Sequence, residues 1–295
     1  MSSLRALVVA LYVLASGCGG DEFSDASNDA GSTGGAGGNG GGGAAGGGAT
    51  GGGAGASGGS GVGGSSGGGA GAPPDAGGGG STSSYASEVL KDSPLVYYRL
   101  NETNGSIAND SSGAPVIDGS YAPQGVTLGQ PGIAPDDGAV GVNQVGNIHV
   151  PATSLTFQGT ASFSLEGWFK PSVVDTARRR LISRFANDIG YILEQSSTEG
   201  VRFLRYREGA TADLAAGSPP VIGTYTHVVA TYDGASICLY VNGAQQDCAS
   251  SPKKILPGAS DVVIGGNAFL GDIDEVAIYA HALSATRVKA HFDAR

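Results

Sequence analysis

The sequence predicts an all-β fold in which two antiparallel sheets pack as a β-sandwich, preceded by a disordered glycine-rich linker. The clearest indication is residues 226–243, THVVATYDGASICLYVNG, in which apolar and polar residues alternate. Asp233-Gly234 and Asn242-Gly243 interrupt the alternation, and such pairs are the strongest short-range signal for β-hairpin turns. A hairpin meander of this kind needs further strands to cover its apolar face, so it indicates a sandwich.

The second observation is the alternation in residues 161–170, ASFSLEGWFK. Phe163, Leu165 and Phe169 fall on one face of the expected strand, and Glu166 and Trp168 fall on the other. The third observation is that many short segments of this type are separated by Gly, Pro, Asn and Asp turns, which is typical of antiparallel sandwiches.

Further strands are expected on both sides of these segments. A helix of one or two turns is expected at residues 85–91 before Pro94, and a short amphipathic helix with a cap near Ser284 closes the chain. Besides the meander and residues 161–170, the predicted strands are 95–100, 121–128, 147–150, 180–185, 191–194, 201–206, 262–265 and 272–279.

Composition divides the 295-residue chain into a leader at 1–18, a linker at 19–84 and a domain at 85–295. More than half of residues 31–80 are Gly, without the strict period of three that collagen requires. A segment with so few apolar side chains cannot offset its ordering entropy, which predicts disorder. The net charge is −10, and the chain has no basic stripe, which argues against nucleic-acid binding. The one basic run, Arg178-Arg179-Arg180, is expected in a solvated turn.

The leader has Arg5, an apolar run from Ala6 to Ala15, and small residues before Cys18. The run is too short to span a bilayer as a helix. Residues 14–18, LASGC, resemble the lipobox of bacterial lipoproteins. The resemblance implies cleavage before Cys18, lipidation of its thiol, and a lipid-anchored protein of the bacterial cell envelope, at the outer membrane.

Several motifs of the domain resemble the bacterial laminin-G-like, or concanavalin A-like lectin/glucanase, jelly-roll family. The resemblance covers about 200 residues and implies the fold rather than the function. The motifs, in chain order, are SPLVYYRLNET, ANDSSG, SFSLEGWFKP, THVVATYDG, LYVNG and LGDIDEVAIYAHALSATRVKAHF.

If Cys18 carries lipid, Cys238 and Cys248 remain as a pair in an oxidising compartment. A two-residue turn at Asn242-Gly243 would place Cys238 opposite Asp247 instead of Cys248. We therefore expect a disulfide accompanied by a β-bulge near residues 243–246; the alternative is two buried free thiols.

The family includes glucanases, and a retaining glycosidase needs two carboxylates ~5–5.5 Å apart. The nearest match is Asp272-Ile273-Asp274-Glu275. Asp272 and Asp274 would lie on the same face of the strand. Strict alternation places Glu275 on the opposite face, and the next position on the shared face is Val276 instead of a third acid. No catalytic residue is therefore predicted, and the chain is not expected to be an enzyme.

Calcium is the one cofactor for which the sequence offers candidates. Glu102, Asp110 and Asp274 lie in family motifs, and many relatives bind Ca²⁺, which takes six to eight oxygen ligands. The alternative is that these acids cap turns or face solvent. The four histidines lack the spacing of a zinc site, and His227 and His291 are expected to be structural.

The sequence identifies no ligand-binding residues. Five aromatic residues could lie at edges or in loops, but each is expected in the core: Tyr121, Phe185, Tyr191, Tyr206 and Phe269. The favoured function is a surface-tethered, non-catalytic module that binds a glycan or an extracellular protein. The alternatives are a structural or adhesion protein of the envelope without a small ligand and, least favoured, a glycoside hydrolase.

Overall fold

The structure, a computed structural model, describes residues 84–295 apart from 114, 152–154, 208, 210 and 259. The predicted leader, its Cys18, and all of the linker except Ser84 lie outside the described residues. Lipidation and linker disorder therefore stay predictions. Neither helix of the described part has the length and apolar character needed to cross a membrane.

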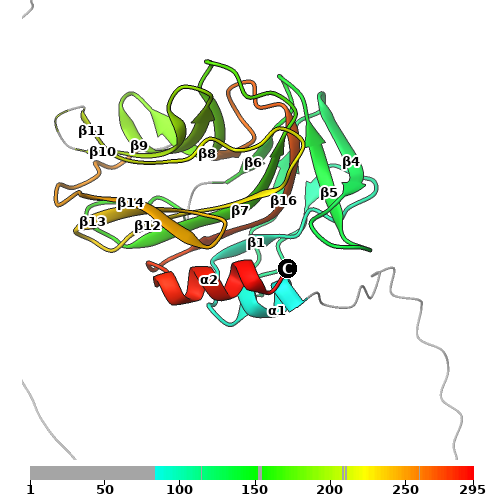
Figure 1. Cartoon of the computed structure of the whole chain (residues 1–295), viewed down its shortest axis with the longest axis horizontal. Coiled ribbons are helices and arrows are strands. Elements are labelled where there is room, and N and C mark those ends of the chain that lie inside the picture. Colours follow the sequence, from blue (N-terminus) through cyan, green and yellow to red (C-terminus); the bar gives the residue numbers. More distant parts are fainter. Residues whose placement is uncertain (1–83, 114, 152–154, 208, 210, 259) are drawn as a thin grey trace, which may run out of the picture. The chain divides into compact units, whose positions relative to one another are not determined.

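Two antiparallel eight-stranded sheets face each other, which confirms the predicted two-sheet sandwich (Figure 1). In spatial order, sheet A contains β14 (Ala244–Ser250), β13 (Ser236–Val241), β12 (Thr226–Tyr232), β7 (Phe163–Pro171), β16 (Gly271–Tyr279), β5 (Gly138–Val142) and β4 (Val126–Pro131), with β1 (Val96–Tyr98) paired to β16. Sheet B contains β11 (Thr211–Gly217), β10 (Gly200–Arg207), β9 (Ile189–Ser196), β8 (Arg179–Ala186), β15 (Val262–Ile264), β6 (Ile148–Val150), β3 (Gly119–Tyr121) and β2 (Ile107–Ala108).

Strand β7 divides its side chains between two apolar clusters, as its alternation predicts. Phe163, Leu165 and Phe169 join the core between the sheets, whereas Trp168 joins a second cluster on the outer face of sheet A. Sheet A is thus apolar on both faces, and its outer face needs a cover of its own.

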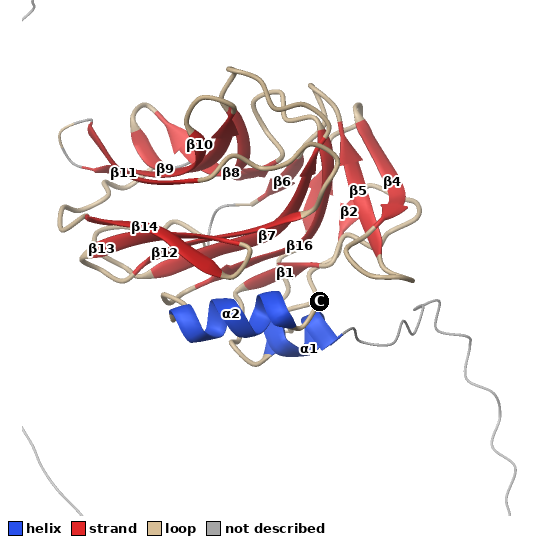
Figure 2. Cartoon of the chain, viewed as in Figure 1, coloured by secondary structure: helices blue, strands red, loops and turns tan. Residues whose placement is uncertain are grey.

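Two helices supply that cover, α1 (Ser84–Leu90) and α2 (Ala285–Asp293) (Figure 2). Ser284 is the N-cap of α2, and its side chain accepts a hydrogen bond from the Arg287 backbone N–H, which confirms the predicted cap. The buried side chains of the helices and of the segment before α2 pack on sheet A around Trp168: Tyr85, Ala86, Val89, Leu283 and Val288.

A buried charge network joins the helices to the sheet at Glu166, which is fully buried. Its carboxylate lies 2.8 Å from His227 Nε2 and 3.0 Å from His291 Nδ1. The hydroxyls of Tyr85 and Tyr279 donate to it at 2.9 and 2.6 Å. Burial raises the pKa of Glu166, but the hydrogen bonds from the two histidines outweigh this and hold the pKa well below its usual range.

The network continues to the surface through His291, whose Nε2 lies 2.7 Å from Asp92 Oδ2. Arg287 donates to Asp92 at 2.8 Å and to Glu88 at 2.7 Å, so α1, α2 and the turn after α1 are held together. His227 and His291 are therefore structural, in line with the prediction.

The strand prediction was wrong at residues 121–128, and it missed several strands, among them β2, β5 and β11. The expected strand at 121–128 is divided between β3 of sheet B and β4 of sheet A. The chain crosses between sheets at Pro123 and Gly125; Gly125 has φ +77°, and a Cβ there would lie 2.1 Å from Asn143 Oδ1. Strand β11, TADLAAG, was not predicted because Ala, Gly and Asp are poor strand formers; full pairing with β10 overrides that preference.

The disulfide between Cys238 and Cys248 is present, with Cα atoms 4.1 Å apart. The two cysteines are directly opposed in the β13–β14 ladder. The register then shifts, because Leu239 pairs with Asp247 and Tyr240 pairs with Gln245, which leaves Gln246 unpaired. This is the bulge that the register argument predicts.

Replacing Cys238 and Cys248 together by Ser should lower the free energy of unfolding by ~2–3 kcal/mol, the loop-closure entropy of a crosslink this short. Urea titration of the double variant beside the parent measures the loss. Ser236→Ala, at the start of β13, is the control and should change stability by less than about 0.5 kcal/mol. An unchanged midpoint in the double variant would contradict the prediction.

Candidate functional site

Strand β16 carries a β-bulge that brings acidic side chains together. In the ladder with β7, Asp274 pairs with Trp168 and Ala277 pairs with Glu166, so Glu275 and Val276 share the space opposite one residue. Glu275 has φ +50°, a left-handed conformation that is uncommon outside glycine. The expectation that Glu275 points away from Asp274 is wrong, because it assumes strict alternation and the bulge breaks that alternation.

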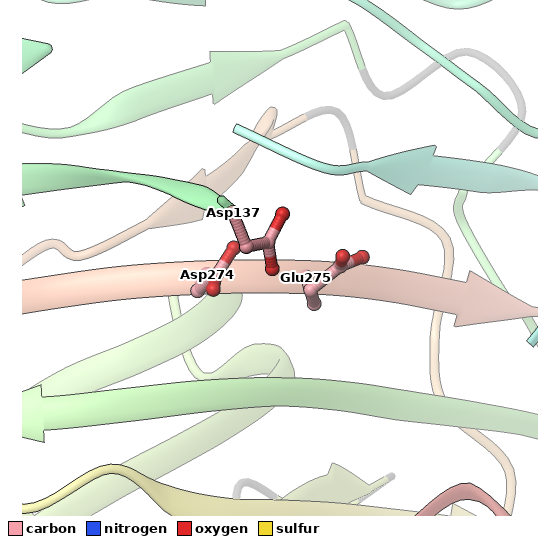
Figure 3. Close-up of side chains that lie close together, drawn as sticks. All are labelled: Asp137, Asp274 and Glu275. Carbon is pink, nitrogen blue, oxygen red and sulfur yellow. The ribbon is translucent and has the colours of Figure 1, made fainter. Parts of the chain in front are cut away.

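Three carboxylates form a cluster here, which we call the acid cluster: Asp137, Asp274 and Glu275 (Figure 3). One oxygen of each lies within 4.8 Å of one oxygen of each of the others. Asp274 and Glu275 come from β16, and Asp137 directly precedes β5. A tight loop fixes Asp137, since its N–H donates to the Ala134 carbonyl at 3.2 Å and its carbonyl accepts from Gly132 at 3.0 Å.

Positive charge and donors are scarce around the acid cluster. Arg99 contacts Glu275 at 3.4 Å and Asp137 at 3.3 Å. The Tyr97 hydroxyl donates to Glu275, and the Ile133 N–H donates to Asp274 Oδ2 at 2.8 Å. Asp137 Oδ2 and Asp274 Oδ1 are buried, and neither has a donor. Two orphaned carboxylate oxygens in a buried site call for a proton or a cation.

The pKa values reflect this deficit of positive charge. Burial, followed by the charges of Glu275 and Asp137, raises the pKa of Asp274 well above its usual range. Burial also raises the pKa of Glu275 to about 8, although the Tyr97 hydrogen bond and Arg99 act in the opposite direction. The pKa of Asp137 is raised by burial, and Asn101 and Arg99 only partly offset that effect. The folded domain therefore gains from any ligand that neutralises these carboxylates.

The donor set of the acid cluster fits calcium. All three side chains offer hard oxygen ligands, and no His or Cys belongs to the cluster. Of the predicted calcium ligands, only Asp274 lies in such a group within the described residues. Asp137 and Glu275 were missed because neither lies in the expected alternation and Asp137 is remote in sequence.

Glu102 and Asp110 instead organise the loops after β1. Glu102 accepts from the Asn109 backbone at 2.8 Å and from the Tyr121 hydroxyl at 2.6 Å. One carboxylate oxygen of Asp110 accepts from the backbone N–H groups of Tyr97 and Ser112, each at 2.9 Å. These contacts correspond to the turn-capping role that was the alternative to calcium binding.

A cavity of about 400 Å³ lies beside the acid cluster. Arg99 and Asp137 line it together with residues around 133–136, but Asp274 and Glu275 do not. A glycosidase needs two carboxyl groups that flank a sugar bond. Because Asp274 and Glu275 are fully buried, the cluster does not fit that role.

The other surface of interest is the outer face of sheet B. Both helices pack on sheet A, so within the described residues no helix covers this face (Figure 1). Tyr191, Leu193 and Phe203 point into the core, which leaves the alternate residues of β8, β9 and β10 pointing outward. We define the outer face of sheet B by these outward residues of the central strands: Arg180, Phe185, Ile192, Glu194, Arg202, Leu204 and Tyr206.

Two aromatic rings meet on this face. Phe185 and Tyr206 are half-buried, and their ring centroids are 4.4 Å apart. Tyr206 also lines a small pocket of about 150 Å³, together with Asn187 and Asp188 of the β8–β9 turn.

The prediction that the five selected aromatic residues belong to the core is right for Tyr121, Tyr191 and Phe269, all of which are buried. It is wrong for Phe185 and Tyr206, which lie outside both apolar clusters.

The arginine run is also not the solvated turn that the sequence suggests. Arg179 is the first residue of β8 and is buried, with its guanidinium 2.7 Å from Asp175. Arg180 is half-buried on the outer face of sheet B, and only Arg178 is exposed.

Residues 144–289 match the family described as the concanavalin A-like lectin/glucanases superfamily. The match includes Asp274, Glu275, Phe185 and Tyr206, and agrees with the resemblance noted in the motifs. No curated protein matches the chain.

Solved structures with the same fold include binding domains. Domain 4 of AbnA, an extracellular arabinanase from Geobacillus stearothermophilus solved with arabinotriose, has a TM-score of 0.55 and 19% identity; the match covers 68% of this chain and 98% of that chain. The binding domain of Paraclostridial Mosquitocidal Protein 1 has a TM-score of 0.57 and 17% identity, covering 69% and 52%. The binding domain of Botulinum neurotoxin DC, solved in complex with SialylT, has a TM-score of 0.55 and 16% identity, covering 69% and 52%. The chain thus spans about half of the two toxin domains, and at these identities the likeness is one of fold.

Proposed function

We propose that this protein is a non-catalytic carbohydrate-binding module and that its ligand binds on the outer face of sheet B. The observation that carries the proposal is the half-buried Phe185–Tyr206 pair beside a pocket lined by Asn187 and Asp188. Sugar rings present C–H faces that pack on aromatic rings, and their hydroxyls bond to amide and carboxylate groups. The arabinotriose complex of the AbnA domain is in keeping with this proposal.

The absence of catalysis is part of the proposal. Asp274 and Glu275 are buried and do not line the neighbouring cavity, so a substrate has no route to them in the described structure. We expect no reducing ends to be released when the protein is incubated with β-glucans. Release that Glu275→Gln abolishes would contradict this.

The acid cluster has a structural role in the proposal, with Asp137, Asp274 and Glu275 holding a Ca²⁺ ion. The ion would supply positive charge to the two orphaned oxygens. The residues themselves connect the bulge of β16 to the loop that precedes β5. Binding there would stabilise the sandwich without contact to the sugar.

The N-terminal segments complete the proposal. The lipobox-like residues up to Cys18 support lipidation and cleavage before Cys18, and the glycine-rich linker at 19–84 supports a flexible tether at the bacterial cell envelope. Mass spectrometry of the mature protein should find an acylated N-terminal Cys18. An unmodified N-terminus at another residue would contradict it.

The ligand proposal is tested with the full chain on a glycan array, followed by calorimetric titration of the best oligosaccharide. Tyr206→Ala should weaken binding by at least about tenfold, because it removes half of the aromatic surface. Tyr225→Ala is the matched control, since Tyr225 is also half-buried but precedes β12 on sheet A. Thermal unfolding of both variants separates loss of binding from loss of fold. Full affinity in Tyr206→Ala would contradict the proposal.

A further inference from the structure

Arg180 lies near the start of β8, on the outer face of sheet B. In the ladders it stands opposite Glu194 of β9, which in turn stands opposite Arg202 of β10. Its guanidinium carbon lies 5.2 Å from the centroid of the Phe185 ring. The cation therefore lies next to the aromatic pair that carries the proposed function.

The carboxylates around Arg180 are already engaged by other arginines. Glu194 forms an ion pair with Arg202. The Glu199 carboxylate accepts hydrogen bonds from Nε and Nη2 of Arg178, at 2.8 and 3.0 Å, and from Arg202 at 2.6 Å. These pairs leave the local acids neutralised.

Arg180 itself has no carboxylate within ion-pair distance among the described residues. Its Nε is buried and has no hydrogen-bond acceptor. An unsatisfied buried donor is costly, and a guanidinium satisfies its donors best with the two oxygens of a carboxylate. The protein therefore supplies a half-buried cation but no carboxylate to pair with it among the described residues.

We infer that the ligand is an acidic oligosaccharide and that Arg180 binds its carboxylate. This deepens the proposed function and rests on it. A sugar acid carries its carboxylate next to the C–H face of its ring, so the ring can pack on Phe185 and Tyr206 while the carboxylate meets Arg180. Asn187 and Asp188 then offer partners for hydroxyls at the far end of the aromatic pair.

The charge environment permits an anion at this position. The carboxylate nearest in the ladder is Glu194, which Arg202 neutralises. Asp213, across from β10, is paired with Arg207 at 2.7 Å. Asp188 is a further acid near this face in the described residues, and it lines the pocket beside Tyr206.

The test compares acidic and neutral probes on the full chain. Calorimetric titrations use trigalacturonate and sialyllactose as acidic probes, with the methyl ester of trigalacturonate and lactose as their neutral counterparts. We expect at least one acidic probe to bind about tenfold or more tightly than its counterpart, with an affinity that falls as salt is added.

Arg180→Gln should remove that advantage while leaving the affinity for the neutral counterpart within about twofold. Arg180→Lys should recover part of it, because the charge remains and the planar fork is lost. Arg178→Gln is the matched control: it removes a neighbouring, exposed arginine that is already paired, and it should keep the preference for acid. Thermal unfolding confirms that each variant is folded.

The outcomes separate the two proposals. If neutral glycans bind with a dependence on Tyr206 while acidic ones have no advantage and Arg180→Gln has no effect, the inference on acidic sugars is overturned and the proposed function stands. If no glycan on the array and none of the four probes binds, both are overturned.

Discussion

Replacing Glu166 by Ala should destabilise the domain by ~3–5 kcal/mol, the loss expected when one partner of a buried charge network is removed. The carboxylate is fully buried and accepts hydrogen bonds from Tyr85 and Tyr279. It also contacts both His227 and His291. Its removal leaves all four groups without their acceptor beneath the two helices.

Urea unfolding measures this loss, and amide hydrogen exchange in α2 locates it. Glu166→Gln keeps the shape and serves as a milder second variant if the Ala variant does not fold. The matched control is Glu199→Ala, which removes a partly exposed glutamate on sheet B and should lose ~0–1 kcal/mol. A loss below about 1 kcal/mol for Glu166→Ala would mean that the network does not hold the helices.

Calcium should raise the free energy of unfolding by ~2.7 kcal/mol at one hundred times its dissociation constant. For a domain of this size that corresponds to roughly 5–10 °C in the unfolding temperature. The physical reason is that the ion provides Asp137 Oδ2 and Asp274 Oδ1 with the positive charge that they lack. Chelation with EDTA should reverse the shift.

The matched pair of variants for this prediction lies two residues apart on one strand. Asp274→Asn removes a charge from the acid cluster and should abolish the response to calcium. Asp272→Asn removes a partly exposed charge that is paired with Lys170, and it should leave the response intact. No shift with calcium, or an equal loss of response in both variants, would contradict the site.

Without calcium, stability should fall as pH rises from about 5.5 to about 8.5. Glu275 has a folded pKa of about 8, above its value in the unfolded chain, so the folded state holds a proton that the unfolded state has lost. Burial lowers the pKa of His291, but Glu166 and Asp92 raise it more, so its contribution is also lost as pH rises through the folded pKa.

Calcium can replace the proton in the acid cluster, and its stabilising effect should therefore be larger at about pH 8.5 than at about pH 5.5. Urea titrations at both pH values, each with EDTA and with calcium, measure the four stabilities. A calcium effect that is equal at the two pH values would indicate that the ion does not compete with protons for Asp274 and Glu275.

The sequence predicted the parts of the fold that local chemistry determines. Alternation on β7 assigned Phe163 and Trp168 to opposite faces. The Asn242-Gly243 turn with its two cysteines predicted a bulge near residues 243–246, and the unpaired residue is Gln246. In each case the information lies within about ten residues, where side-chain periodicity and turn geometry are decisive.

The candidate sites depend on information that alternation does not contain. Glu275 joins Asp274 only because a left-handed residue breaks the register of β16, and Asp137 arrives from the loop before β5. Phe185 and Tyr206 look like core residues because a strand with apolar residues on both faces does not indicate which face is covered. Which face of a sheet is covered depends on where α1 and α2 pack.

That packing also determines how the domain can be connected to other proteins. The Ser84 hydroxyl donates to the Ala294 carbonyl, so the first described residue and the last turn of the chain are neighbours. Both lie with the helices on the outer side of sheet A, away from the outer face of sheet B (Figure 2). The domain could therefore be inserted into a surface loop of a host protein, or immobilised on a sensor chip through either end, with the outer face of sheet B left accessible.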